Sequence, residues 1–127
     1  MGIICTKNKY KGWCIIMQRG EIWIVDLHRG VGSEQGLVRP GIIVQNNIGN
    51  KYAPTVTIVP LTAKTKKWLP THATLVNTTC LEYISTALAE QITTIDKARL
   101  IKYIGKVDYR DMENLNMAIK VQNGLVG

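Results

Sequence analysis

Short apolar runs, separated by turns rich in glycine, proline and asparagine, follow one another along most of the chain. Runs of this length with turn residues at both ends are typical of β-strands. Residues 41–46 form an apolar run that favours a strand buried on both faces, and 47–54 has the composition of a turn. The pattern predicts five strands, at residues 19–27, 41–46, 55–61, 71–76 and 84–92.

The end of the chain is expected to add one more strand and a helix. Residues 93–100 are expected to form a helical turn, and 101–107 a sixth strand, because apolar and polar residues alternate there with period two. The helix that follows has Asp108 as its capping residue and Asp111 in its first turn. Its apolar stripe, which should pack on the sheet, consists of Met112, Leu115, Ala118 and Ile119.

These elements predict a mainly β fold with a C-terminal helix, built on a small, strongly bent sheet or barrel. A chain of 127 residues with 46% hydrophobic and 20% charged residues fits one globular domain with a substantial core. The net charge of +7 at pH 7 favours an anionic partner, of which nucleic acid is the commonest. A basic surface that only keeps the protein soluble is the alternative.

Residues 1–16 stand apart, because they show no clear period and contain two of the three cysteines. Lys11-Gly12-Trp13 would be encoded by a purine-rich stretch resembling a ribosome-binding site just before Met17. Our hypothesis is therefore that 1–16 is a non-native or disordered extension and that 17–127 is the domain. The charge would then fall from +7 to +4, since the extension carries three lysines and no acidic residue. A genuine docking arm is the alternative.

The cysteines and the hydrophobicity profile indicate a cytoplasmic protein. Cys5, Cys14 and Cys80 have no metal-ligand spacing and leave one thiol over in any pairing, which favours a reducing compartment. No apolar run approaches the ~20 residues needed to span a bilayer. No signal peptide is expected either, because lysines interrupt the apolar residues near the N-terminus.

Polar chemistry is concentrated in two loops. The first, 32–37, lies between predicted strands and leads to Arg39, which Pro40 should hold in an extended conformation at the mouth of the next strand. The second, 62–68, is basic and ends in Trp68. Its lysines Lys64, Lys66 and Lys67 could bind phosphates and Trp68 could stack on a base, or the lysines are merely solvated. For Trp68 we favour a place in the core.

Several short motifs, in order along 18–126, carry a resemblance to a known family. They are Arg19-Gly20-Glu21-Ile22-Trp23, Gly32-Ser33-Glu34-Gln35-Gly36, Arg39-Pro40, Gln45-Asn46, Pro60-Leu61-Thr62, Leu69-Pro70-Thr71-His72 and Glu90-Gln91-Ile92. Together they resemble the MazF/PemK family of toxin endoribonucleases. The resemblance implies an SH3-like barrel of the MazF/PemK/CcdB type. It also implies a homodimer that binds single-stranded RNA in its interface groove, and a MazE-like antitoxin that competes for this groove.

Nothing in the sequence calls for a cofactor. The nine acidic residues are scattered and the two histidines lie far apart, so a metal site for phosphoryl transfer is not expected. RNA carries its own nucleophile, the 2′-hydroxyl, which needs only alignment and stabilisation of charge on the phosphate. The guanidinium of Arg39 suits that role, because it binds phosphate oxygens in two-point geometry.

The resemblance assigns roles to individual residues. Arg39 and Thr62 match the family's catalytic arginine and threonine, which cleave RNA to a 2′,3′-cyclic phosphate and a 5′-hydroxyl end without a metal. Glu34 is expected to contact RNA, with catalysis possible. The other candidates for RNA contact are Ser33, Gln35, Asn46, Lys64, Thr71, His72 and Gln91. For His72, a purely structural role is the alternative, and for Arg39 and Thr62 the alternatives are a surface ion pair and a strand-end turn.

The recognition loop departs from the common family pattern at two places. His28-Arg29 stands where a proline is frequent, and Leu37 where a second glycine is common. Both changes bear on the preferred cleavage sequence more than on activity. Two other classes stay open: a toxin of the same fold that inhibits DNA gyrase, and an RNA-binding barrel without catalysis. Arg39 and Thr62 favour the endoribonuclease.

Overall fold

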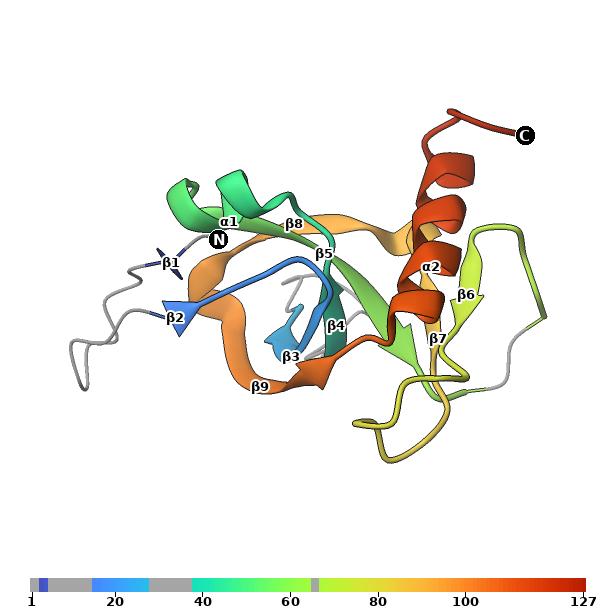
Figure 1. The fold of residues 1–127 in the computed structure, drawn as a ribbon, viewed down its shortest axis with the longest axis horizontal. Helices are drawn as coiled ribbons and strands as arrows, with labels where there is room; N and C mark the ends of the chain where they lie inside the picture. Colours follow the sequence, from blue (N-terminus) through green and yellow to red (C-terminus); the bar gives the residue numbers. More distant parts are fainter. Residues whose placement is uncertain (1–2, 5–14, 28–37, 65–66) are drawn as a thin grey trace, which may run out of the picture.

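The chain folds as one bent antiparallel sheet with a long helix against it (Figure 1). The computed structural model describes residues 3–4, 15–27, 38–64 and 67–127. Seven strands form the main sheet in the order β6-β7-β5-β4-β3-β9, with β8 paired to β5. They are β3 (Glu21–Asp26), β4 (Val38–Ile43), β5 (Thr55–Thr62), β6 (His72–Thr74), β7 (Thr86–Leu88), β8 (Thr93–Asp96) and β9 (Leu100–Lys106).

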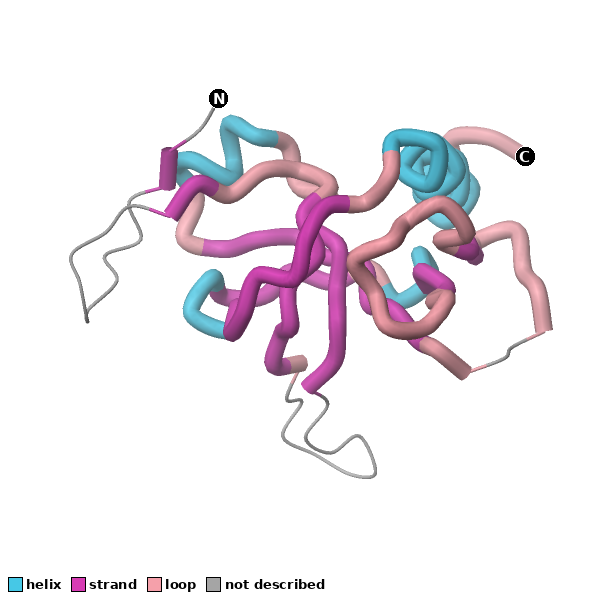
Figure 2. The backbone as a smooth tube through the Cα atoms, turned by 60° about the horizontal axis from the view of Figure 1, so that its bottom comes forward, coloured by secondary structure: helices cyan, strands magenta, loops and turns pink. Residues whose placement is uncertain are grey.

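The predicted fold class, mainly β with a C-terminal helix, is confirmed. Among the described residues the sheet does not close into a complete hydrogen-bonded ring, since its outer strands β6 and β9 do not pair with each other. The strands curl round one another as in a barrel (Figure 2). A separate two-stranded sheet joins β1 (Ile3–Ile4) to β2 (Ile15–Ile16).

β5 is the strand that the others share. It pairs with β4 through Ile58–Pro60 along one edge, and with both β8 and β7 along the other. From the pair Leu61–Ala87 to the pair Ile58–Thr93 there are three residue steps along β5, but six along the segment that carries β7 and β8. The three extra residues form a 3-10 helix, η1 (Ala89–Gln91). The strand predicted at 84–92 is therefore present only at Thr86–Leu88, because η1 interrupts it.

The predicted turn at 47–54 was wrong, because a short helix, α1 (Asn47–Tyr52), lies there. The side chain of Asn46 caps its start by accepting a hydrogen bond from the Gly49 N–H at 2.8 Å. Lys97 stabilises its end, donating to the Asn50 carbonyl at 2.7 Å. Burial lowers the pKa of Lys97. The predicted helical turn at 93–100 holds only for η2 (Lys97–Arg99), since β8 occupies the preceding residues.

Both faces of the sheet are buried at its centre. Ile42 and Ile43 of β4 are each 0% exposed and belong to two different apolar clusters, which confirms the strand buried on both faces. This strand runs from Val38 to Ile43, three residues earlier than predicted at each end. One cluster lies under the helix α2 (Tyr109–Gln122), which contributes Leu115 and Ala118, and the other lies on the opposite face. The predicted helix and its apolar stripe are confirmed.

A buried carboxylate fixes α2 to the segment between β6 and β7. Asp111 is 0% exposed and accepts hydrogen bonds from the backbone N–H of Asn77, the Asn77 side-chain amide and the Thr78 hydroxyl, at 3.0, 2.9 and 2.6 Å. Thr78 in turn accepts from the N–H of Asp108, the residue that caps the helix, at 3.1 Å. This network places the segment 77–85 beside the sheet.

We predict that Asp111→Ala lowers the free energy of unfolding by about 2–4 kcal/mol, because three donors inside the protein lose their acceptor. Glu113→Ala, an exposed acid on the same helix, is the matched control and should change stability little. Urea unfolding followed by circular dichroism measures both. Equal effects of the two substitutions would contradict a structural role for the Asp111 network.

Candidate active site

Arg39 lies in β4, next to Val25 of β3 in the pairing register, and is half-buried. The face from which it projects can be read from Gly41, two residues along the strand. A Cβ on Gly41 would lie 3.2 Å from Ile58 Cδ1 and 3.3 Å from Val25 Cγ2, so the odd positions of β4 face those two side chains. Since alternate residues share a face, Arg39 belongs to this same face, away from α2.

Thr62 is the last residue of β5 and is also half-buried. Its hydroxyl oxygen accepts a hydrogen bond from the backbone N–H of Lys64 at 3.2 Å. Accepting this bond does not use the hydroxyl proton, which can still be donated to an anionic oxygen. The bond also fixes the start of the basic loop relative to Thr62, so the backbone of the exposed Lys64 is held beside the hydroxyl.

The strand register places Arg39 and Thr62 on one face of the sheet, near the same end of their strands. Gly41 pairs with Pro60 across β4 and β5, and in the described part of the chain the β4–β5 ladder ends with this pair. Arg39 and Thr62 each lie two residues beyond this pair, and the alternation of side chains along a strand puts both of them on the same face. A guanidinium and a hydroxyl, far apart in sequence, thus belong to the same face near the same end of β4 and β5.

The structure separates the remaining predicted site residues into groups. Ser33, Glu34 and Gln35, with the departures at His28, Arg29 and Leu37, lie outside the described residues, as does Lys66. Asn46 lies beyond the other end of β4 from Arg39, where it caps α1. Lys64 and Lys67 are exposed. Trp68 is 68% exposed, so its expected place in the core was wrong: the segment 67–70 lies on the surface.

Thr71 and His72 both contact an acid that sequence reasoning missed, Glu90. Glu90 accepts from the Thr71 hydroxyl at 2.8 Å, and its other oxygen lies 2.9 Å from Nε2 of His72, whose side chain is 3% exposed. Desolvation raises the pKa of Glu90, but hydrogen bonds from His72 and Thr71 outweigh it and the net pKa is lowered. Gln91 is the exposed neighbour of Glu90. The pairing register of β6 with β7 creates this contact, which no local motif signals.

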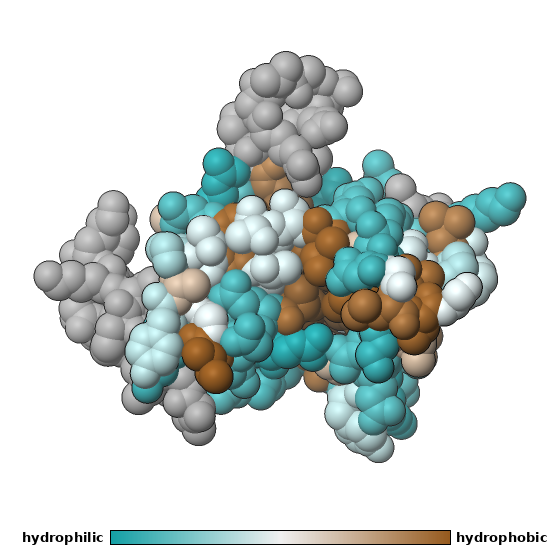
Figure 3. Space-filling view, turned by 90° about the horizontal axis from the view of Figure 1, so that it is seen from above, coloured by the Kyte–Doolittle hydropathy of each residue, from teal (hydrophilic) through white to brown (hydrophobic). Residues whose placement is uncertain are grey.

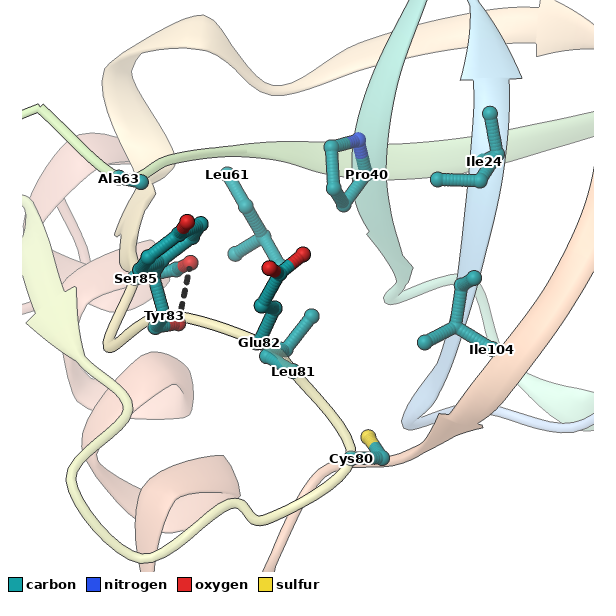
Figure 4. Close-up of a pocket in the computed structure, with 10 residues that line it drawn as sticks. All are labelled: Ile24, Pro40, Leu61, Ala63, Cys80, Leu81, Glu82, Tyr83, Ser85 and Ile104. Carbon is teal, nitrogen blue, oxygen red and sulfur yellow. Dashed lines mark hydrogen bonds between the residues drawn. The ribbon is translucent and has the colours of Figure 1, made fainter.

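A cavity of about 350 Å³ lies on the other face of the sheet from Arg39 (Figure 4). Pro40 and Leu61, the direct neighbours of Arg39 and Thr62, line it together with Ile24 and Ile104. The segment after β6 forms its outer wall, where Cys80 and Glu82 are drawn pointing inward (Figure 4). The cavity and the Arg39–Thr62 pair are therefore distinct features, one on each face.

The surface combines polar groups with apolar patches (Figure 3). Exposed large apolar residues include Tyr83, Ile84, Ile101 and Tyr103. In the part of the chain that the structure describes, no three His, Cys, Asp or Glu residues are grouped so as to hold a metal ion. No helix there is long and apolar enough to cross a membrane.

Comparison with known proteins decides the family. The PemK-like, MazF-like toxin family of type II toxin–antitoxin systems matches residues 18–122. The chain belongs to this family. The match includes both Arg39 and Thr62, and it confirms the resemblance found in the sequence.

Relatives within the MazF family are named as endoribonucleases. Endoribonuclease EndoA of Bacillus subtilis is 40% identical over 114 residues, which cover 88% of this chain and 98% of the relative. Endoribonuclease MazF of Staphylococcus saprophyticus is 39% identical over 112 residues, covering 87% and 93%. A solved mycobacterial endoribonuclease in complex with its cognate antitoxin is 30% identical, with a TM-score of 0.73 and coverage of 87% and 98%.

Proposed function

We propose that this MazF-family toxin is a sequence-specific endoribonuclease that cuts single-stranded RNA in the cytoplasm without a metal ion. The observation that carries the proposal is the register that brings Arg39 and Thr62 to the same face at one end of β4 and β5. Relatives at about 40% identity that are named endoribonucleases support the same activity.

The attacking group in this proposal belongs to the RNA. The 2′-hydroxyl adjacent to the scissile phosphate attacks phosphorus and expels the 5′-oxygen of the next nucleotide. The products are a 2′,3′-cyclic phosphate and a 5′-hydroxyl end. The protein then has to hold the phosphate in line with the 2′-oxygen and to stabilise the charge that develops on its oxygens.

Arg39 and Thr62 together hold the phosphate and stabilise the charge on its oxygens. The guanidinium of Arg39 keeps its charge and offers two parallel N–H donors, which match two phosphate oxygens. Its position in a paired strand limits its backbone freedom before the substrate arrives. Thr62 accepts from Lys64 N–H and can donate its proton to the phosphate, so its hydroxyl is already oriented. Both groups act on charge that grows in the transition state, which is where such donors contribute most.

The remaining sequence candidates fit around this centre. Lys64 follows Thr62 and can attract neighbouring phosphates, as Lys67 can from the same loop. Ser33, Glu34 and Gln35 belong to the loop that leads into β4, the strand of Arg39. We expect this loop to contribute to the choice of cleavage sequence. A MazE-like antitoxin is the expected regulator, as in the solved mycobacterial complex of a toxin with its antitoxin.

We predict that Arg39→Ala lowers cleavage of a mixed-sequence RNA by at least ~10²-fold, the usual loss when one oriented donor is removed. Thr62→Val, which keeps the shape and loses the hydroxyl, should also be strongly impaired. Thr94→Val, an exposed threonine on β8, serves as the matched control and should cleave normally. Thermal unfolding must be similar in all variants, and near-normal cleavage by Arg39→Ala would remove it from the mechanism.

A second prediction concerns the nucleophile. Cleavage should persist in excess EDTA, and replacing the 2′-hydroxyl at the cut by hydrogen should abolish it while the RNA still binds through its phosphates. The 3′ fragment should accept a label from a kinase without phosphatase treatment, because it starts with a 5′-hydroxyl. Cutting of the deoxy-substituted RNA, or activity that needs magnesium, would show that water or a metal performs the attack.

A third prediction concerns the assembly. A single small sheet offers a shallow surface, whereas a two-fold dimer would form a groove between two copies of the Arg39–Thr62 pair. The exposed apolar residues Tyr83, Ile84, Ile101 and Tyr103 provide surface for such a contact. Sedimentation equilibrium should give twice the chain mass at assay concentrations. A fully active monomer would exclude the groove.

A further inference from the structure

A row of threonine hydroxyls continues the Arg39–Thr62 pair across the sheet. Thr62 of β5 pairs with Thr86 of β7, and Thr86 pairs with Thr74 of β6. The neighbouring row, Leu61, Ala87 and Ala73, is buried in the cluster under α2. Because alternate residues point to opposite faces, the three threonines lie on the same face as Arg39. Thr86 is half-buried and Thr74 is exposed.

The hydroxyls of this row are only weakly satisfied by one another. Thr86 Oγ1 and Thr74 Oγ1 are 3.4 Å apart, long for a hydroxyl pair, whose usual separation is about 2.7–2.8 Å. Elsewhere in the sheet, Thr57 and Thr94 form a cross-strand hydroxyl pair at 3.0 Å. Thr57 lies an odd number of residues from Thr62 along β5, so that pair is on the opposite face. Thr57 and Thr94 therefore form a cross-strand pair comparable to Thr74 and Thr86, but on the face away from Arg39.

We propose that Thr86 binds the RNA phosphate next to the one that is cut, with Thr74 as the next contact in the row. This inference rests on the proposed function, because it uses Arg39 and Thr62 to place the scissile phosphate. Neighbouring strands are about 4.8 Å apart, so each step along the row moves one hydroxyl farther from the cut. Threonine hydroxyls are common donors to phosphate oxygens, and they position the nucleic acid without reading its sequence.

The contact differs from those of Arg39 and Thr62 in its effect on the reaction. A phosphate beside the cut carries the same charge in the bound RNA and in the transition state. A hydrogen bond to it therefore strengthens binding of both equally, and its loss raises KM while kcat stays nearly constant. If the Thr74–Thr86 pair were purely structural, losing it would lower the stability of the protein and would not raise KM relative to kcat.

The test is steady-state cleavage of a short RNA with one cut site by Thr86→Val, which conserves the shape of the side chain. We expect KM to rise about five-fold, as for one lost hydrogen bond, with kcat within about two-fold of wild type. Thr86→Ser, which keeps the hydroxyl, should retain the wild-type KM, and Thr94→Val should leave both constants unchanged. A wild-type KM for Thr86→Val, or an equal rise for Thr94→Val, would overturn the inference.

A modified substrate identifies the phosphate. An uncharged methylphosphonate linkage is moved one position at a time along each side of the cut. At one linkage next to the cut, the methylphosphonate should raise the KM of the wild-type protein. It should not raise the KM of Thr86→Val any further, since the substitution and the modified linkage remove the same contact. Additive effects at every position would overturn the inference. Failure of the wild-type protein to cut any RNA would instead defeat the proposed function, which distinguishes the two failures.

Discussion

Backbone pairing along β5 is the constraint on which both the core and the candidate site depend. This one strand bonds to β4 on one edge and to β7 and β8 on the other, so its register sets which residues of four strands share a row. Leu61 and Thr62 are adjacent in sequence, yet alternation directs one into the core and the other to the opposite face. A slip of one residue would exchange these rows, burying the polar groups and exposing the apolar ones. Core packing thereby specifies the position of the site.

Sequence patterns predicted the strands that carry a clear local pattern and failed where tertiary contacts decide the structure. The continuous apolar run in β4 and the period-two alternation of β9 were both visible in the sequence. The helix α1 was not, because its six residues, rich in asparagine and glycine, show no apolar period. Its ends are held by Asn46 and by Lys97, the latter 47 residues from its acceptor in the chain. Likewise η1 forms because β7 and β8 pair with β5 in different registers. These pairings join residues that are distant in sequence, so a short stretch of the chain does not reveal them.

The candidate site was predicted in part. Arg39 and Thr62 could be named from motifs, but their common face follows only from the pairing of β4 with β5. The proposed contribution of Thr86 follows from its pairing with Thr62, 24 residues earlier in the chain. Glu90 was missed because its partner His72 lies 18 residues earlier, in β6, whereas Glu90 belongs to η1. Trp68 was misplaced because hydrophobic character alone favoured the core, whereas the structure leaves it on the surface. Sequence thus supplied the chemistry of single residues, and the strand registers supplied their combination.

The two faces of the sheet are mechanically linked at the site. Pro40 and Leu61 line the cavity on one face, while Arg39 and Thr62, bonded to them through the backbone, belong to the other. The segment 77–85 that walls this cavity is held to α2 through Asp111. Leu61 shares one apolar cluster with Leu115 of that helix. A phosphate-binding guanidinium and hydroxyl must keep their geometry within a fraction of an ångström to remain effective. The apolar cluster that buries Leu61 therefore holds the strand end from which Thr62 projects to the other face.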